Sequence, residues 1–182
     1  MIKLIVAVDR GNAIGWKDGR LPWKIPVDMK RFKELPTGYP VLMGFNTFES
    51  LGRKEGLPNR QNYVLTRRNP VELFGKTGDT IQIISSLDMC KRFAKSETEH
   101  LWLIGGASVY AEALDAGIVD EIYLTVVDSN SGADVTLKHD LAAWKLFVLQ
   151  QEKLGIIWEV HVQYPHVEPP SPEITFVVLR KF

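Results

Sequence analysis

Short apolar runs that alternate with helical segments over residues 2–127 constrain the fold of this chain most strongly. The runs have the length of strands, and glycine, proline or polar residues separate them. A strand followed by a helix and another strand predicts a parallel sheet with helices on its faces. The expected strands are residues 2–8, 39–43, 62–66, 80–84, 101–104 and 121–127.

The helices between these strands are indicated by capping residues and apolar spacing. One begins near Pro26, because proline suits the first helical position, and extends to about Leu35. Ser85 or Ser86 is the expected N-terminal cap of the helix at residues 87–95. Residues 11–24 hold three glycines and a proline and are predicted to form a loop. After the helix that begins near Pro26, helices are expected at residues 46–51, 87–95 and 108–114.

The last third of the chain is expected to hold strands and no helix. Residues 144–151, 156–164 and 174–180 are predicted strands, and residues 165–172, with four prolines, are a predicted loop. The last two strands would add an antiparallel hairpin at one edge of the sheet. The expected fold class is α/β, a three-layer α/β/α sandwich, in one domain that spans residues 1–182.

Charge and cysteine content exclude several classes of protein. Lys plus Arg and Asp plus Glu number 22 each, without a basic block, which argues against nucleic-acid or membrane-surface partners. No apolar run is long enough to span a bilayer. Cys90 is the only cysteine, so we expect a reducing compartment, the cytoplasm.

Several common functional motifs are absent. No G-x-G-x-x-G follows the first strand, and no G-x-S-x-G marks a hydrolase nucleophile. Gly75-Lys76-Thr77 resembles the end of a phosphate loop, but Pro70 stands where that motif needs glycine. No histidine pairs with a cysteine or carboxylate at metal-ligand spacing, so we predict no metal site.

Asp28 is the most informative charged residue. On a helix that begins at Pro26, Asp28, Phe32 and Leu35 share one face, so a carboxylate lies on the apolar stripe. Two interpretations stay open. Asp28 complements the positive end of the helix dipole, or it is a desolvated carboxylate of a functional site with a raised pKa.

Two further segments suit phosphate groups. Residues 101–114 form a buried strand, Gly105-Gly106 and a helix, an arrangement that lets a ligand approach the backbone near helix N–H groups. Thr66-Arg67-Arg68 ends a predicted strand and offers hydroxyl and guanidinium donors. Taken singly, the first segment is better explained as a tight turn and the second as ordinary surface charge.

Together and in this order, these pieces resemble the dihydrofolate reductase family over nearly the whole chain. The resemblance implies an eight-stranded, mostly parallel sheet. It also implies NADPH-dependent reduction of 7,8-dihydrofolate to 5,6,7,8-tetrahydrofolate, with hydride transfer to pterin C6 and protonation at N5, in one-carbon metabolism and thymidylate synthesis. The matching blocks are residues 13–15, 21–23, 26–33, 40–44, 47–53, 57–60, 63–67, 104–110 and 123–125.

The resemblance assigns roles to individual residues. Asp28 would hold the pterin amino group and ring nitrogen, Thr125 would hydrogen-bond that carboxylate, and Arg60 would pair with the carboxylate of the glutamate tail. The catalytic residues implied are Asp28, Trp23 and Thr125. The implied substrate-binding residues are Ile5, Ala7, Asp28, Met29, Phe32, Leu51, Leu57, Arg60 and Thr125. Antifolate inhibitors and a monomeric state are implied as well.

The implied cofactor site runs along the nicotinamide, the pyrophosphate and the 2′-phosphate of NADPH. Thr47 would meet the pyrophosphate, and Thr66 with Arg67 the 2′-phosphate. Gly105-Gly106 would be the family's cis peptide. Residues 15–23 would be a mobile loop, held by Asp134, that excludes water. The implied cofactor residues are Ala7, Ile14, Gly15, Thr47, Thr66, Arg67, Ile104, Gly105, Gly106, Ala107, Ser108, Val109 and Tyr110.

Some positions depart from the family pattern, and two rival functions remain. Phe45 stands where a basic residue near the cofactor phosphates is usual, so Phe45→Arg is expected to tighten NADPH binding. Residues 54–56 lengthen one loop and residues 135–138 alter another. The related reductase of riboflavin synthesis shares fold and cofactor, although Asp28 after Leu-Pro-Trp argues for the folate enzyme. A catalytically silent nucleotide- or folate-binding protein is the other rival.

Overall fold

One eight-stranded sheet organises the chain in a computed structural model that describes residues 1–73, 75–94 and 96–182. Its strands are β1 (Ile2–Asp9), β3 (Val41–Gly44), β4 (Asn62–Leu65), β5 (Ile81–Ile84), β6 (Leu101–Gly105), β7 (Glu121–Val127), β9 (Trp158–Gln163) and β10 (Ile174–Lys181). Their order is β5-β4-β3-β6-β1-β7-β10-β9. Neighbours from β5 to β7 are parallel, whereas β10 is antiparallel to β7 and β9. The expected sheet with its antiparallel edge hairpin is confirmed.

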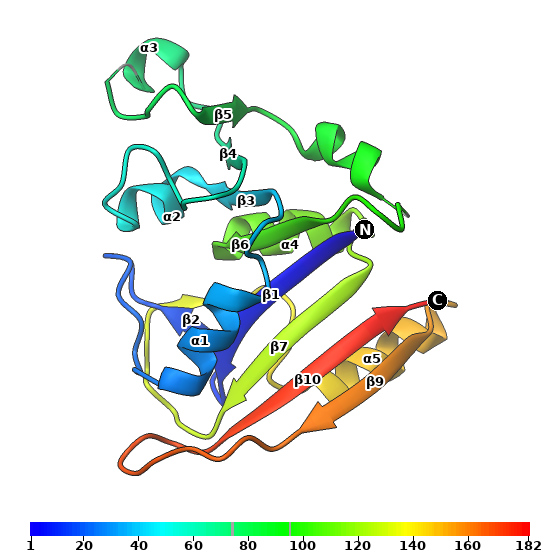
Figure 1. Cartoon of the computed structure of the whole chain (residues 1–182). Coiled ribbons are helices and arrows are strands. Elements are labelled where there is room, and N and C mark those ends of the chain that lie inside the picture. Colours follow the sequence, from blue (N-terminus) through cyan, green and yellow to red (C-terminus); the bar gives the residue numbers. More distant parts are fainter. Residues whose placement is uncertain (74, 95) are drawn as a thin grey trace.

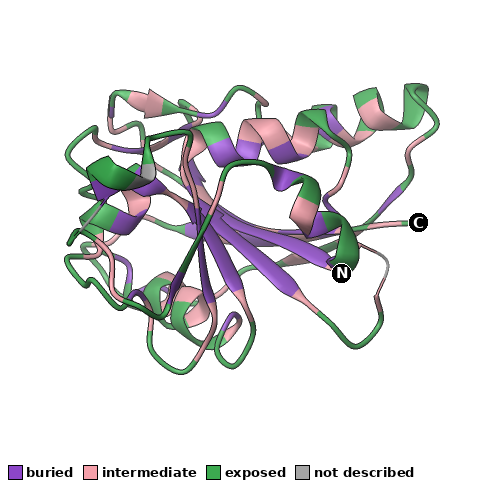
Figure 2. Ribbon diagram, turned by 90° about the horizontal axis from the view of Figure 1, so that it is seen from above, coloured by how far each residue is buried: buried purple, intermediate pink, exposed green. Residues whose placement is uncertain are grey.

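Helices cover both faces of this sheet. They are α1 (Pro26–Glu34), α2 (Phe45–Ser50), α3 (Pro70–Leu73), the 3₁₀ helix η1 (Leu87–Phe93), α4 (Ala107–Asp115) and α5 (Trp144–Lys153). Figure 1 shows α1 in front of the sheet and α4 and α5 behind it, and Figure 2 shows the buried strands between the two helical layers. The three-layer α/β/α sandwich is therefore confirmed. None of these helices, over the residues described, has the length and apolarity that crossing a membrane requires.

The core divides according to the alternation of side chains along the strands. In β1, Leu4 and Val6 belong to the largest buried cluster, which contains Tyr110 of α4. Ile5 points to the other face and joins a second cluster with Phe45 of α2. A central strand buried on both faces has the near-continuous apolar sequence seen at residues 2–8, which is why the sequence predicted this element well.

The predicted strand at residues 144–151 was wrong, because this segment forms α5. Trp144, Phe147 and Val148 recur at helical spacing and pack on the largest core cluster, with Phe147 buried. The continuous apolar stretch also fits a buried strand, and periodicity alone does not separate the two. The structure thus adds a helix where none was expected.

Smaller differences concern short elements. The predicted loop at 11–24 contains β2 (Ala13–Gly15), which pairs with β8 (Val135–Thr136). The predicted helix at 87–95 is η1, capped by Ser86, whose hydroxyl accepts from the Asp88 backbone N–H at 3.0 Å. Its expected last residue, Lys95, lies outside the described residues. Such elements are too short to carry a periodic pattern.

The strand order places the carboxyl ends of β1, β4, β6 and β7 along one edge of the sheet. β1 lies between β6 and β7, so the chain winds away from it in both directions. Open α/β sheets bind ligands outside the carboxyl ends of their strands at such a switch point. Gly105 ends β6 and Thr66 follows β4, while Thr125, which contacts Asp28 of α1, lies near the carboxyl end of β7.

Candidate active site

Asp28 of α1 is tied to Thr125 of β7. Pro26 begins the helix and Asp28 lies in its first turn. The Thr125 hydroxyl donates a hydrogen bond to Asp28 Oδ1 at 2.6 Å, although the two residues are 97 positions apart. This bond joins the carboxylate to the sheet and favours the site interpretation of Asp28 over simple complementation of the helix dipole.

The surroundings of Asp28 raise the pKa of its carboxyl group above the usual value. Desolvation is the largest cause, because burial disfavours the charged form. The hydrogen bond from Thr125 and the positive charge of Arg31 act in the opposite direction and offset this effect only in part. A half-buried carboxylate with a raised pKa is typical of binding and catalytic sites.

Apolar residues of β1 and nearby segments flank this pair. The register of β1 and β7 places Ala7 beside Thr125. Ile5 is buried two positions before Ala7, and the cluster around Ile5 includes three half-buried side chains that the family resemblance assigns to the substrate. These three side chains are Phe32, Leu51 and Leu57.

The family resemblance assigns two other residues, Met29 and Arg60, to the substrate. Met29 follows Asp28 on α1, and its relative exposure is 48%. Arg60 donates from Nε to the Pro58 carbonyl oxygen at 3.0 Å and from Nη2 to Thr37 Oγ1 at 3.1 Å. Thr37 follows α1 in the chain, so these bonds hold the Arg60 guanidinium beside the end of that helix.

Gly105 and Gly106 connect β6 to α4 through a cis peptide bond, as the family resemblance implies. Thr47 of α2 lies against them. A Cβ atom on Gly105 would be 3.3 Å from Thr47 Oγ1, and one on Gly106 would be 3.2 Å from the same oxygen. Gly105 also has φ of +136°, which side-chain-bearing residues rarely adopt. The two glycines therefore allow the Thr47 side chain to approach this backbone closely.

The first turn of α4 is fixed to the sheet by its buried side chains. The Tyr110 hydroxyl donates to the Ile5 carbonyl oxygen at 2.6 Å, and Tyr110 is buried. Val109 and Ile104 are buried, Ala107 is half-buried, and Ser108 is exposed. Val109 and Tyr110 therefore face the core, so their assigned contact with a cofactor would come from the backbone.

The loop at residues 15–23 is attached at both ends. The Lys17 backbone N–H donates to Asp134 Oδ1 at 2.9 Å, as the resemblance implied for Asp134. A Cβ on Gly19 would lie 2.5 Å from Ser50 Cβ, so the tip of the loop touches the end of α2. Trp23 packs on the cluster around Ile25, and its Nε1 is buried without an acceptor in the described part of the chain.

Comparison with known proteins decides the family. The family model described as dihydrofolate reductase matches residues 1–163. The chain belongs to the dihydrofolate reductase family. It is 38% identical over 134 residues to dihydrofolate reductase type 3 of Salmonella typhimurium, covering 74% of this chain and 76% of that protein.

Other members of the dihydrofolate reductase family are similar over most of their length. The Bacillus subtilis dihydrofolate reductase is 36% identical over 156 residues, with 83% of this chain and 84% of that protein covered. A solved Enterococcus faecalis dihydrofolate reductase, complexed with NADP(H) and RAB-propyl, superposes with a TM-score of 0.76. Sequence identity to that structure is 25%, and 100% of this chain and 96% of the other are covered.

The phosphate-binding end assigned by the dihydrofolate reductase resemblance lies at the end of β4. Thr66 follows that strand, and its Oγ1 accepts from the Arg68 backbone N–H at 3.1 Å. The Arg67 side chain is 83% exposed and lies 3.9 Å from the Glu112 carboxylate. A weakly held arginine is free to turn to an incoming phosphate.

Phe45 departs from the dihydrofolate reductase pattern, and the structure explains how the chain accommodates it. Phe45 is buried in the second core cluster beside Phe48. Arg68 lies over its ring at 4.5 Å and donates to Asn46 Oδ1 at 3.4 Å. A guanidinium therefore occupies the surface beside Phe45, which agrees with the alternative that Arg68 supplies the charge absent from position 45.

Asp9 is a second residue whose role sequence reasoning missed. It ends β1 and is fully buried. One carboxylate oxygen accepts from the backbone of Gly11 and Ala13, and the other from the backbone and hydroxyl of Ser131. Desolvation opposes ionisation of Asp9, but these hydrogen bonds outweigh it and lower its pKa. Asp9 thus joins the loop after β1 to the loop that carries Asp134.

Proposed function

We propose that this chain reduces 7,8-dihydrofolate to 5,6,7,8-tetrahydrofolate with NADPH as the reductant. The Asp28–Thr125 pair carries the proposal, because it sets a half-buried carboxylate beside apolar side chains of β1 and α1. Family membership and a fold shared over the whole chain support the same reaction.

Asp28 would bind the pterin ring. A carboxylate accepts hydrogen bonds from an amino group and a ring N–H side by side, which orients a planar ring. Thr125 fixes one of the two carboxylate oxygens through its 2.6 Å bond. Ile5, Ala7 and Phe32 would contact the ring through apolar surface. The outer wall would be formed by Met29, Leu51 and Leu57, with Arg60 at the glutamate tail.

The proton added to N5 would come from water, and Asp28 would favour its arrival. A negative charge beside the ring stabilises the protonated form of a nearby nitrogen. Trp23 has a buried Nε1 donor with no acceptor in the described part of the chain. The loop that carries Trp23 would keep other water from the reacting atoms.

The residues along the carboxyl edge of the sheet fit NADPH, which supplies the hydride when bound. The cradle without Cβ atoms at Gly105 and Gly106, next to Thr47, is the structural observation that supports this fit. Thr66 and Arg67 would hold the 2′-phosphate. The backbone of residues 104–110, together with Ala7, Ile14 and Gly15, would line the rest of the NADPH site.

A single assay tests the proposed reaction. Purified protein, NADPH and dihydrofolate are followed at the NADPH absorbance, with the ribosylamino-pyrimidine substrate of riboflavin synthesis in a parallel reaction. Oxidation of NADPH with dihydrofolate alone supports the proposal. Turnover of the pyrimidine alone assigns the rival reductase, and binding of both ligands without turnover assigns a silent binding protein.

We also propose that the protein is a monomer in the cytoplasm. Cys90 is a free, buried cysteine whose pKa desolvation raises to about 11, which suits a thiol that stays reduced. Light scattering on the purified chain tests the oligomeric state. Leu146 and Leu149 are 54% and 55% exposed on α5, so a dimer, if found, is expected to involve this helix.

A further inference from the structure

Arg31 lies on α1 one turn beyond Asp28, and its side chain points at the sheet. Its guanidinium carbon is 4.1 Å from the ring centre of Phe176 on β10 and 5.7 Å from that of Tyr123 on β7. Arginine stacked on aromatic faces loses much of its freedom to reorient. The charged group is therefore held between the helix and the two strands.

The guanidinium also reaches the hydroxyl that binds Asp28. Arg31 Nη1 donates to Thr125 Oγ1 and to the Leu124 carbonyl oxygen, both at 3.2 Å. Guanidinium groups only donate, whereas a hydroxyl donates one proton and accepts at its lone pairs. With Arg31 donating to the Thr125 oxygen, the single hydroxyl proton points to Asp28.

We propose that Arg31 is a positioning residue for the reduction: it orients the Thr125 hydroxyl and holds the Asp28 carboxylate in its charged form. Nothing in the family pattern quoted from this sequence assigned a role to this position. The inference rests on the proposed function only for the role of Asp28 in binding the pterin. The electrostatic link between Arg31 and Asp28 is a property of the free protein.

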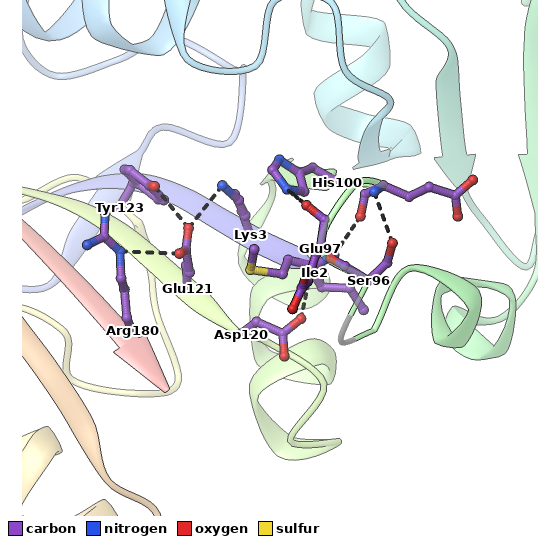
Figure 3. A network of polar contacts seen from close by, with 11 residues as sticks. Ile2, Lys3, Ser96, Glu97, His100, Asp120, Glu121, Tyr123 and Arg180 are labelled. Atoms are coloured by element: carbon purple, nitrogen blue, oxygen red, sulfur yellow. Dashed lines mark hydrogen bonds and ion pairs between the residues drawn. The ribbon is translucent and has the colours of Figure 1, made fainter. Parts of the chain in front are cut away.

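On the neighbouring strands, Lys3, Glu121 and Arg180 are paired with one another. Glu121 of β7 contacts Lys3 of β1 at 3.1 Å and Arg180 of β10 at 3.2 Å, and the Tyr123 hydroxyl donates to Glu121 at 2.9 Å (Figure 3). Among the described residues, Arg31 is the cation whose charge acts on Asp28.

The direction of the effect follows from these contacts. Desolvation raises the pKa of Asp28, and the hydrogen bond from Thr125 and the charge of Arg31 lower it in part. A positive charge near a carboxylate favours its charged form and lowers its pKa. Loss of the Arg31 charge is therefore expected to move the titration of Asp28 to higher pH.

Three substitutions separate charge from geometry. Arg31→Gln removes the charge and retains a donor, and Arg31→Met removes both and retains much of the apolar stem. Arg31→Lys retains the charge and N–H donors but loses the planar guanidinium group. Lys30→Met is the matched control, because Lys30 is exposed on the same helix and pairs only loosely with Glu34 at 3.9 Å.

The first measurement is a ¹³C NMR titration of the aspartate carboxyl carbons in the free protein, with Asp28→Asn to assign the signal. Arg31→Gln and Arg31→Met are expected to raise the pKa of Asp28, whereas Arg31→Lys and Lys30→Met leave it near the wild-type value. If the folded neutral variants titrate Asp28 at the wild-type pH, Arg31 is only a packing residue and the inference is wrong.

The second measurement is the dissociation constant of dihydrofolate as a function of pH. As pH falls, binding to the neutral Arg31 variants is expected to weaken at a higher pH than in the wild type, because their Asp28 becomes protonated at higher pH, while NADPH affinity stays constant. An equal loss at every pH, with a lower melting temperature, would indicate a structural role and contradict the inference. If the neutral Arg31 variants raise the pKa of Asp28 but the wild-type protein does not reduce dihydrofolate, the proposed function is refuted. The electrostatic link between Arg31 and Asp28 would still stand.

Discussion

The guanidinium of Arg68 stacks on the ring of Phe45, with its central carbon 4.5 Å from the ring centre. The two residues follow different parallel strands, β3 and β4, that pair with each other. A cation thus lies at the carboxyl edge of the sheet near α2, although the residue at position 45 is apolar. This relationship changes what a substitution at Phe45 is expected to do.

Phe45→Arg is now expected to destabilise the protein rather than to tighten NADPH binding. Phe45 is 4% exposed in the second core cluster, so the new side chain loses that packing and carries a charge towards the core. The loss should be at least about 3 kcal/mol, as for aromatic truncations in cores. Urea unfolding measures it. Tighter NADPH binding with unchanged stability would instead restore the expectation drawn from the sequence.

Arg68→Ala tests the cation itself. NADPH affinity at low salt is expected to fall, and the difference from wild type should shrink at high salt because exposed charges are screened. The stability of the core should change little, since Arg68 is exposed. Equal NADPH affinity at both salt concentrations would show that the Arg68–Phe45 contact only covers the ring.

Asp28→Asn should separate catalysis from stability. At neutral pH kcat/KM is expected to fall by about 10²–10⁴-fold, with recovery in acid as the substrate arrives protonated. Because desolvation raises the folded-state pKa of Asp28 above 3.8, ionised Asp28 costs stability as pH rises through that folded pKa. The variant should therefore unfold at higher denaturant concentration at neutral pH. Near wild-type turnover across the pH range would remove Asp28 from the site.

Arg67→Ala should raise KM for NADPH more than KM for NADH. The side chain is 83% exposed, so the effect is expected to be only about two- to fivefold. Glu112→Gln is the matched control, because it frees Arg67 from its carboxylate neighbour and should leave or slightly improve NADPH binding. Equal changes for the two cofactors would show that Arg67 is ordinary surface charge.

Glu121→Ala should destabilise the fold by about 3–5 kcal/mol, because it leaves Lys3 buried without its partner. Although desolvation opposes it, hydrogen bonds from Lys3 and Tyr123 lower the pKa of Glu121 from 4.5. Its stabilisation is present above the unfolded-state value and is lost as pH falls through the folded pKa. A Lys3→Met, Glu121→Leu double variant should recover most of the loss; a loss equal to that of Glu121→Ala alone would contradict the unpaired-charge explanation.

Gly19→Ala should displace the loop that carries Trp23. Gly19 has φ of +88°, and a Cβ there would lie 2.5 Å from Ser50 Cβ. Ser50→Gly in the same protein removes the clash but not the backbone strain, so it should restore activity only in part. Steady-state kinetics of the three variants measure this, and full activity of Gly19→Ala would show that the contact with Ser50 is dispensable.

The sequence by itself determined the elements whose evidence is local. Pro26 fixed the start of α1, and helical spacing then placed Asp28 on the face of Phe32 and Leu35. Apolar runs bounded by glycine and proline located the strands of the sheet within about two residues. The family resemblance implied a hydrogen bond between Thr125 and Asp28, and the structure contains that bond.

The tertiary structure alone decided which distant groups meet. Arg31 lies 94 positions from Thr125, and Asp9 lies 122 from Ser131, so no local pattern contains either contact. Sheet order and register bring them together, because strands from opposite ends of the chain must pair before their side chains can touch. The same reason explains α5: an apolar run fits strand or helix, and packing on the core selects between them.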